Sequence, residues 1–163
     1  MLHTIAYCIR GILETGIISG NRHYVEAATK AADALLENIR DDGSLAGRFD
    51  SGWRPTVRWS CLTGDAQISI IFGRLYQTLN EVKYLQALKK INAYLMKKQL
   101  IHPSNVDMHG GICGSFPITG EYGKFEILNW AVKFFMDALM LEQTLAESSS
   151  SSSPSNCAKQ LKS

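Results

Sequence analysis

Apolar residues recur every three or four positions along most of the chain, the spacing that places them on one face of an α-helix. The first such segment covers residues 2–18, where the shared face is formed by Ile5, Ile9, Ile12 and Leu13. A second segment, residues 22–40, follows after Gly20 and Asn21 and ends at "DDGS". Because only a short polar turn separates the two segments, they predict an antiparallel helical hairpin.

A second hairpin is predicted after a long loop. Residues 41–62 contain Gly43, Gly47, Gly52 and Pro55, too many helix-breaking residues for a regular helix. Helical spacing resumes at residues 66–78, and Thr63 or Asp65 is placed to cap that helix. Its partner covers residues 81–98, with an inward face made of Tyr84, Leu85, Leu88, Ile91 and Leu95.

The two hairpins are related by an internal repeat. The segment "GILETGIISGNRHYVEAATKAADALL" matches "GRLYQTLNEVKYLQALKKINAYLM" at an offset of 60 residues. A last helix is predicted over residues 125–145, after a loop at 101–123, and "DALMLEQ" within it echoes "GRLYQTL". The pattern therefore predicts an all-α domain of antiparallel hairpins with five main helices, residues 1–147, followed by a disordered Ser-rich tail, residues 148–163.

The composition indicates which partners and which location to expect for this protein. The net charge is +2, and basic residues form no dense block, which argues against nucleic acid as a partner. Arg10 and Glu14 interrupt the first apolar segment, so we expect no membrane span and a cytoplasmic location. The four cysteines show no CxxC spacing, which favours reduced thiols; Cys8 is expected in the core and Cys157 exposed in the tail.

Three stretches of the chain resemble a known family. They are "HTIAYCIRGILETG", "GRFDSGWRPTVRWSCLTGDAQISI" and "GGICGSFPITGEYGKFEILNWAVKFFMDALMLE". Together they are similar to the C-terminal part of a family of bacterial α/α-toroid proteins related to terpenoid cyclases, protein prenyltransferases and six-hairpin sugar-processing enzymes. The resemblance covers residues 2–147 and implies a partial toroid, further hairpins before "HTIAY" and a place near polysaccharide metabolism. One departure is Cys113, where the family pattern "GGIKGS" has a basic residue.

In an α/α toroid the first helix of each hairpin lines the central cavity, so polar residues on those helices are candidates for a site. The first predicted helix carries His3, Tyr7 and Arg10 at intervals of four and three, and the third carries Gln67 and Arg74 seven apart. On the fifth, next to Trp130, a polar strip consists of Glu126, Asn129, Lys133 and Asp137. The alternative for this strip is an ordinary solvated face.

The loops add aromatic and cationic side chains to these candidates. Aromatic rings stack on sugar rings, and arginine forks bind carboxylates or sulfates at two points, so the loops predict an acidic saccharide as ligand. The residues concerned are Arg48, Trp53, Arg54, Arg58, Trp59, Glu121 and Tyr122. The alternative is structural, with the tryptophans packed in the core and the arginines at helix C-termini.

Catalysis and metal binding have weaker signals. Glu126, Glu121 and His3 are the candidates for general acid/base chemistry, with Asp65 as a further carboxylate. A zinc site would use Cys61, His109 and Cys113, but two glycines separate the last two and the spacing matches no zinc motif. No phosphate loop or nucleophile elbow is present, so we expect no cofactor.

Three functions remain open from the sequence. The first is an α/α-toroid domain that binds or processes an acidic saccharide. The second is a non-catalytic scaffold or subunit, in which the open half-ring pairs with another copy or with a missing N-terminal toroid half, because exposed apolar faces mark interfaces. The third is a zinc-dependent cyclase or transferase.

Overall fold

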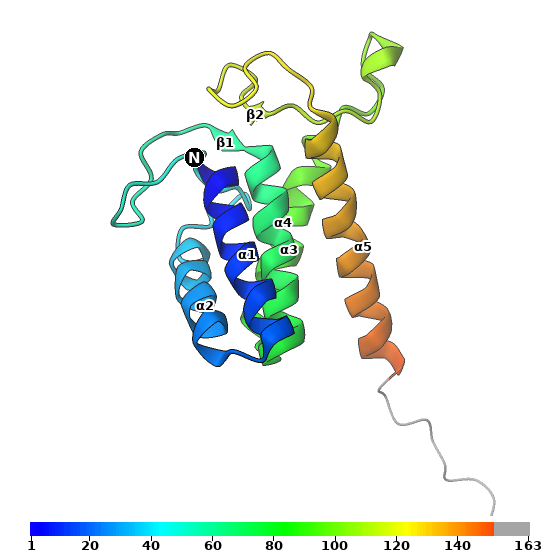
Figure 1. Cartoon of the computed structure of the whole chain (residues 1–163). Helices are drawn as coiled ribbons and strands as arrows, with labels where there is room; N and C mark the ends of the chain where they lie inside the picture. Colours follow the sequence, from blue (N-terminus) through cyan, green and yellow to red (C-terminus); the bar gives the residue numbers. More distant parts are fainter. Residues whose placement is uncertain (152–163) are drawn as a thin grey trace, which may run out of the picture.

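The structure is a computed structural model that describes residues 1–151. It confirms an all-α fold of antiparallel hairpins with five main helices (Figure 1). Within the described range the other regular elements are one turn of 3-10 helix and a sheet of two short strands. The predicted tail lies mostly outside the described residues, as does Cys157, although the last helix continues to Ser151, past the predicted tail start at residue 148.

The first hairpin pairs α1 (Leu2–Ser19) with α2 (Arg22–Leu36). Gly20 ends α1 in a left-handed conformation that glycine adopts without strain, with φ 68°. Asn21 then caps α2 by accepting a hydrogen bond from the His23 amide. The helix α2 ends four residues earlier than predicted, because the amides of Asn38 and Ile39 form turns with Leu35 and Leu36, and the Arg40 amide donates to the Ser44 carbonyl.

The second hairpin pairs α3 (Leu62–Leu79) with α4 (Val82–Met96), joined by Asn80 in a left-handed conformation. The helix α3 begins four residues before the predicted start, so Thr63 and Asp65 lie inside its first turn instead of capping it. Asp65 accepts a hydrogen bond from the amide of Leu45, which is distant in the sequence. The expectation of a cap at these two residues was therefore wrong.

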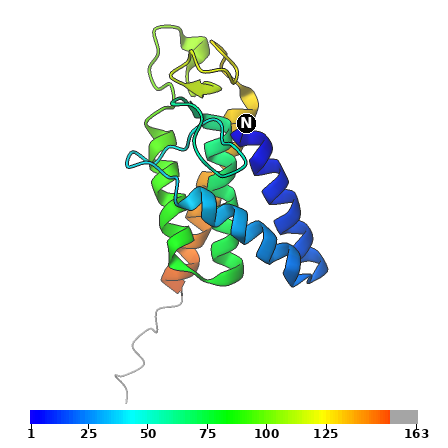
Figure 2. The same ribbon diagram turned by 90° about the vertical axis from the view of Figure 1, so that its left-hand side faces the viewer.

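The three helices α1, α3 and α5 (Asn129–Ser151) form an arc with α3 in the middle, and α4 lies behind α3 and α5 (Figures 1 and 2). The helix α2 packs on α1 and faces the viewer in Figure 2. Because α5 starts at Asn129, Glu126 belongs to the preceding loop and not to the predicted polar strip of the helix.

The core is built around α3, in which every residue from Leu62 to Gly73 is buried. Asn92 of α4 connects three helices in this core: its amide oxygen accepts from Ser69 of α3, and its amide nitrogen donates to Ala138 and Glu142 of α5. Because all of these buried polar groups are paired, the network fixes the relative position of the three helices.

The two long loops lie at one end of the bundle, beside the N-terminus (Figure 1). The strands β1 (Ser60–Cys61) and β2 (Ser115–Phe116) pair antiparallel, which joins the loop before α3 to the loop before α5. A short 3-10 helix, η1 (Val106–Met108), precedes β2. Trp59 packs against both loops: a side chain added at Gly47 would collide with its indole ring, and one added at Gly120 would lie only 3.1 Å from it.

Two properties of α1 bear on the sequence predictions. Cys8 is exposed and not part of the core as expected, because it lies at a cavity between α1 and α2 that the side chains of the two helices do not fill. None of the helices within residues 1–151 combines the length and the hydropathy that a transmembrane segment requires.

Candidate functional site

An aromatic cluster joins α1 to α5 on the side of the arc that faces away from α4. His3 lies 4.2 Å from the ring of Tyr122, and Tyr7 lies 6.5 Å from His3 and 6.0 Å from Phe134, measured between ring centroids. Trp130 donates its indole N–H to the Tyr122 hydroxyl over 3.0 Å. We call this surface the inner face and define it by His3, Tyr7, Tyr122, Trp130 and Phe134. Tyr7 and Trp130 are each about half exposed, at 54% and 47%.

Tyr122 is held differently at its backbone and at its side chain. The hydroxyl of Ser115 donates to the Tyr122 carbonyl over 2.7 Å and accepts from the Tyr122 amide over 3.2 Å. The phenol accepts a hydrogen bond from the Trp130 indole and makes a tilted contact with the His3 ring, with 36° between the ring planes. Burial raises the pKa of Tyr122, opposed by the Trp130 indole and the nearby Thr63 hydroxyl, so the phenol is neutral at physiological pH.

Beneath the aromatic cluster, α3 buries two polar side chains that have no hydrogen-bond partner. Thr63 and Gln67 are only 1% and 2% exposed, and the Thr63 hydroxyl oxygen and the Gln67 amide oxygen are unpartnered within residues 1–151. The two lie one turn apart on the same side of the helix. Gln67 points about 160° away from Ser69, which faces α4, so it faces the region that Tyr7 and Phe134 cover.

Unpaired buried polar groups are rare, since each loses the free energy of hydration without replacement. The Nδ1 atom of His3 is a third such atom at the same end of the arc. Burial, reinforced by the N-terminal ammonium, lowers the pKa of His3, so its imidazole is neutral at pH 7. On the inner face, neutral hydrogen-bonding groups that lack partners therefore lie next to exposed aromatic rings.

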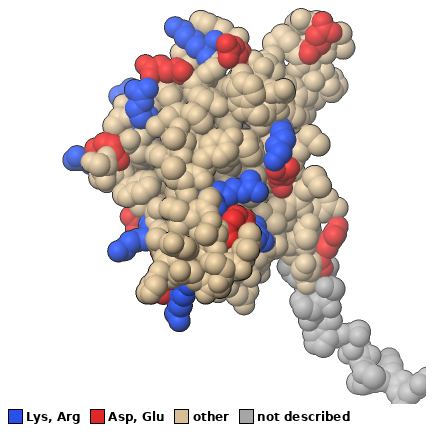
Figure 3. Space-filling view, viewed as in Figure 1, with Lys and Arg blue, Asp and Glu red and all other residues tan. Residues whose placement is uncertain are grey.

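The rim of the inner face carries one exposed ion pair. Arg48, in the loop before β1, donates to Glu121 over 2.7 Å, and Glu121 is the residue before Tyr122. Figure 3 shows a broad uncharged area on the upper part of this side of the molecule, bordered by neighbouring positive and negative side chains. The charges around the area are therefore largely balanced.

Lower on the arc the charged candidates are paired as well. Arg74 forms two hydrogen bonds to the Glu14 carboxylate, at 2.8 and 2.9 Å, and this pairing raises the pKa of Arg74 and lowers that of Glu14. On α5, Lys133 forms an ion pair with Asp137. Arg74 is two turns below Gln67, so it lies on the same side of α3 but away from the aromatic cluster.

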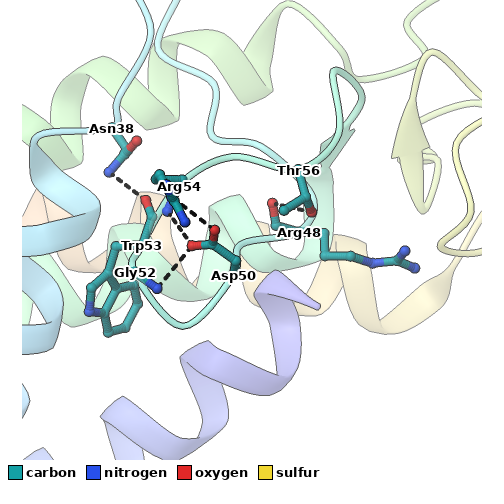
Figure 4. Close-up of polar contacts among 7 residues, drawn as sticks. All are labelled: Asn38, Arg48, Asp50, Gly52, Trp53, Arg54 and Thr56. Carbon is teal, nitrogen blue, oxygen red and sulfur yellow. Dashed lines mark hydrogen bonds and ion pairs between the residues drawn. The ribbon is translucent and has the colours of Figure 1, made fainter.

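Trp53 and Arg54 belong to a different part of the surface. The Asp50 carboxylate accepts hydrogen bonds from the amides of Gly52 and Arg54 and from the Arg54 guanidinium (Figure 4). The resulting turn holds Trp53 in a left-handed conformation, with φ 61°, and its carbonyl accepts from Asn38. Its indole lines an apolar cavity of about 300 Å³ between α1 and α2. The structure does not bring these two predicted binding residues to the inner face.

The remaining predicted residues divide between packing and solvent. Trp59 packs between the two loops, in agreement with the alternative that the tryptophans have a packing role. Arg58 is exposed and forms no ion pair with another of the described residues. Asn129 and Glu126 are exposed near the start of α5, beside Trp130.

The zinc candidates do not assemble into a ligand set. Residues 1–151 contain no group of three or more His, Cys, Asp or Glu side chains that could hold a metal ion. Cys61 is fully buried, and burial raises the pKa of its thiol to about 12, so the thiolate that zinc binds is strongly disfavoured. His109 is exposed, next to His102.

Sequence reasoning found part of this site and missed part of it. His3, Gln67, Tyr122 and Trp130 were predicted and do lie at one end of the arc. Thr63 was interpreted only as a cap, although its spacing of four from Gln67 would have placed both on one helix face. No known protein family, curated protein sequence or solved structure matches this chain.

Proposed function

We propose that this protein binds an acidic saccharide on its inner face. One observation carries the proposal: exposed aromatic rings lie beside buried polar atoms that have no partner. The rings are those of Tyr7 and Trp130, and the polar atoms belong to His3, Thr63 and Gln67. Aromatic rings stack on the apolar faces of sugars, and the hydroxyl groups of a sugar can satisfy neutral donors and acceptors.

Arg48 supports an acidic ligand. Its ion pair with Glu121 is exposed, and an exposed pair is worth only about 0–1 kcal/mol. A uronate or sulfate can therefore replace Glu121 on the guanidinium at low cost, with the two-point geometry that arginine favours. The resemblance to toroid proteins near polysaccharide metabolism points the same way.

The proposal is tested by calorimetric titration of the full chain with neutral, uronic and sulfated oligosaccharides. Trp130→Ala removes an exposed ring from the inner face, and we expect it to weaken binding at least tenfold. Tyr24→Ala is the matched control, because Tyr24 is similarly exposed, at 46%, on α2. Absence of binding by every saccharide, or equal effects of the two substitutions, would contradict the proposal.

A second function, as a subunit that pairs through the open edge of the arc, has a separate observation in its favour. Residues on one edge of α1 are exposed, whereas the residues 60 positions later in α3, their counterparts in the repeat, are all buried. The exposed set is Thr4, Cys8, Gly11, Ile12 and Thr15, and the buried set is Gly64, Ile68, Ile71, Phe72 and Leu75. In α3 this edge is covered by neighbouring helices: Gly64 packs against Leu2 and His3 of α1, and Phe72 stacks on Tyr84 of α4.

Light scattering tests this second function. If a second copy covers the edge, Ile12→Glu converts a dimer to a monomer. Ile18→Glu is the control, since Ile18 is 85% exposed on α1 and lines none of the cavities along the edge. A wild-type chain that stays monomeric at high concentration would rule out self-pairing.

A further inference from the structure

The Tyr122 side chain contacts His3 and lies near Thr63. Its position therefore determines which part of a bound saccharide can reach the buried polar atoms. We propose that a neutral sugar unit displaces the Tyr122 side chain and hydrogen-bonds to Thr63 and Gln67, while an adjacent acidic unit binds Arg48 at the rim. The ligand class is thus a chain in which neutral and acidic units adjoin. This inference rests on the proposed function and specifies its ligand.

The buried groups are suited to a neutral unit because none of them is charged. Thr63 and Gln67 carry no charge, and burial keeps the His3 imidazole neutral at pH 7. A carboxylate placed against Thr63 and Gln67 would lose its hydration, and no Lys or Arg side chain within residues 1–151 forms a hydrogen bond to either residue. The positive charge that acts on His3 is the N-terminal ammonium, whereas Arg74 and Lys133, lower on the arc, are already paired with carboxylates of the protein itself.

The displaced group is the phenol of Tyr122, and the structure shows why it can move alone. The Ser115 hydroxyl forms hydrogen bonds to both the backbone amide and the backbone carbonyl of Tyr122. The side chain accepts a hydrogen bond from the half-exposed Trp130, lies close to the Thr63 hydroxyl and makes a tilted ring contact with His3. A rotation of the side chain gives up these contacts, while the two hydrogen bonds that Ser115 makes to the Tyr122 backbone can stay in place.

The acidic unit is assigned to Arg48 by adjacency. Glu121, the partner of Arg48, directly precedes Tyr122 in the chain, so we assign the acidic unit to the guanidinium and the neutral unit to the position of the Tyr122 side chain. Neither side chain of this pair is buried, at 44% and 61% exposed, so its carboxylate can be exchanged. Different groups of the protein therefore recognise the two sugar units: hydrogen bonds recognise the neutral unit, and charge recognises the acidic unit.

The experiment compares three saccharides on the full chain by calorimetry: cello-oligosaccharides as neutral chains, oligogalacturonate as an acidic chain, and hyaluronan oligosaccharides, in which uronic and neutral units alternate. We expect the alternating chain to bind at least tenfold more tightly than either of the others. Thr63→Val and Gln67→Met keep shape but remove the polar atoms, and each should weaken binding of the alternating chain about tenfold. Neither should change the weaker binding of oligogalacturonate.

Arg48→Gln is the complementary variant and should weaken both acid-containing chains without affecting the neutral one. A Tyr122→Ala variant should bind the alternating chain at least as tightly as wild type, because the neutral unit no longer displaces the phenol. Saccharide binding that is insensitive to Thr63→Val and Gln67→Met overturns this inference and leaves the proposed function standing. Failure of every saccharide to bind overturns both.

Discussion

The helices α1 and α3 occupy equivalent places in the repeat but have opposite surroundings. In α3 the residues from Leu62 to Gly73 are all buried, because α1, α4 and α5 surround it. In α1 one edge remains exposed, including Ile12 at 41% and Cys8. The same sequence pattern therefore yields a central helix in one place and a terminal helix in the other, depending on whether a neighbour is present.

The difference also explains where unsatisfied polar groups are found. On the exposed edge of α1, Thr4 and Thr15 are open to water. On α3, the elements packed around Thr63 and Gln67 exclude water. The Thr63 hydroxyl lies near the Tyr122 phenol, but neither it nor the Gln67 amide oxygen completes a hydrogen bond of good geometry within residues 1–151. Burial of these groups in α3 therefore lowers the stability of the protein, and a ligand that hydrogen-bonds to them can recover part of that free energy.

The strongest test of the comparison truncates one apolar side chain in each helix. Phe72 is fully buried and stacks on Tyr84, so Phe72→Ala should lower the free energy of unfolding by about 3–5 kcal/mol. Its counterpart Ile12 is 41% exposed, so Ile12→Ala should cost less than about 1 kcal/mol. Urea denaturation followed by circular dichroism measures both. Equal costs would mean that the edge of α1 is covered in solution.

Asp65 should make the stability of α3 depend on pH. Complete burial raises its pKa well above the ordinary value, despite the hydrogen bond from Leu45. The folded state therefore favours the protonated carboxyl, and this contribution is fully present below the unfolded-state pKa of about 3.9 and declines as pH rises above it.

The substitution Asp65→Asn removes the titration and keeps an oxygen for the Leu45 amide. We expect the variant to gain stability relative to wild type as pH increases from 4 to 8. The measurement is the difference between their unfolding free energies at several pH values. A difference that does not change with pH would show that the wild-type carboxyl is ionised at little cost in the folded protein.

A smaller effect is expected from the unpartnered groups. Thr63→Val and Gln67→Met replace them by apolar groups of similar size, and each should raise the free energy of unfolding by about 1–2 kcal/mol. Thr15→Val on α1 is the control, because the Thr15 hydroxyl already donates to the Gly11 carbonyl and is exposed. Thermal unfolding of all three variants measures these changes in stability. A loss of stability at residues 63 and 67 would indicate hydrogen bonds to water in the resting protein.

The smallest effect concerns the two helices' glycines. Gly11 lies on the open edge of α1 with no atom within 4 Å of an added side chain, so Gly11→Ala should stabilise by about 0.5–1 kcal/mol. In α3, Gly73→Ala would bring a methyl group against Leu141 and Leu88, and we expect a loss instead. Opposite shifts in melting temperature are the expected result. A loss at Gly11 too would contradict an open edge.

Most of the fold could be predicted because helical spacing is a local property. The face of α4 that contains Tyr84, Leu88, Ile91 and Leu95 is buried as predicted. Element boundaries were less accurate where a distant partner decides them: Asp65 looks like a cap from its neighbours, but its hydrogen bond goes to Leu45. Cys8 has the spacing of a core residue but is exposed, since it lines a cavity between α1 and α2.

The candidate site was harder to predict for the same reason. Trp53 and Trp59 are close in sequence and similar in type, yet one lines a cavity beside α2 and the other packs against Gly47 and Gly120. Their roles depend on contacts that no local pattern encodes. Gln67 was identified because its side of α3 could be inferred from periodicity alone.

The position of Trp59 has a consequence for how the two loops beside the inner face can move. Its indole fills the space left by two glycines, one in each loop, and the pairing of β1 with β2 joins the same loops beside it. Because the ring and the strand pairing both connect the two loops, we expect the loops beside the inner face to move together. Selectivity on the inner face would then depend on side-chain rotations and not on movement of one loop relative to the other.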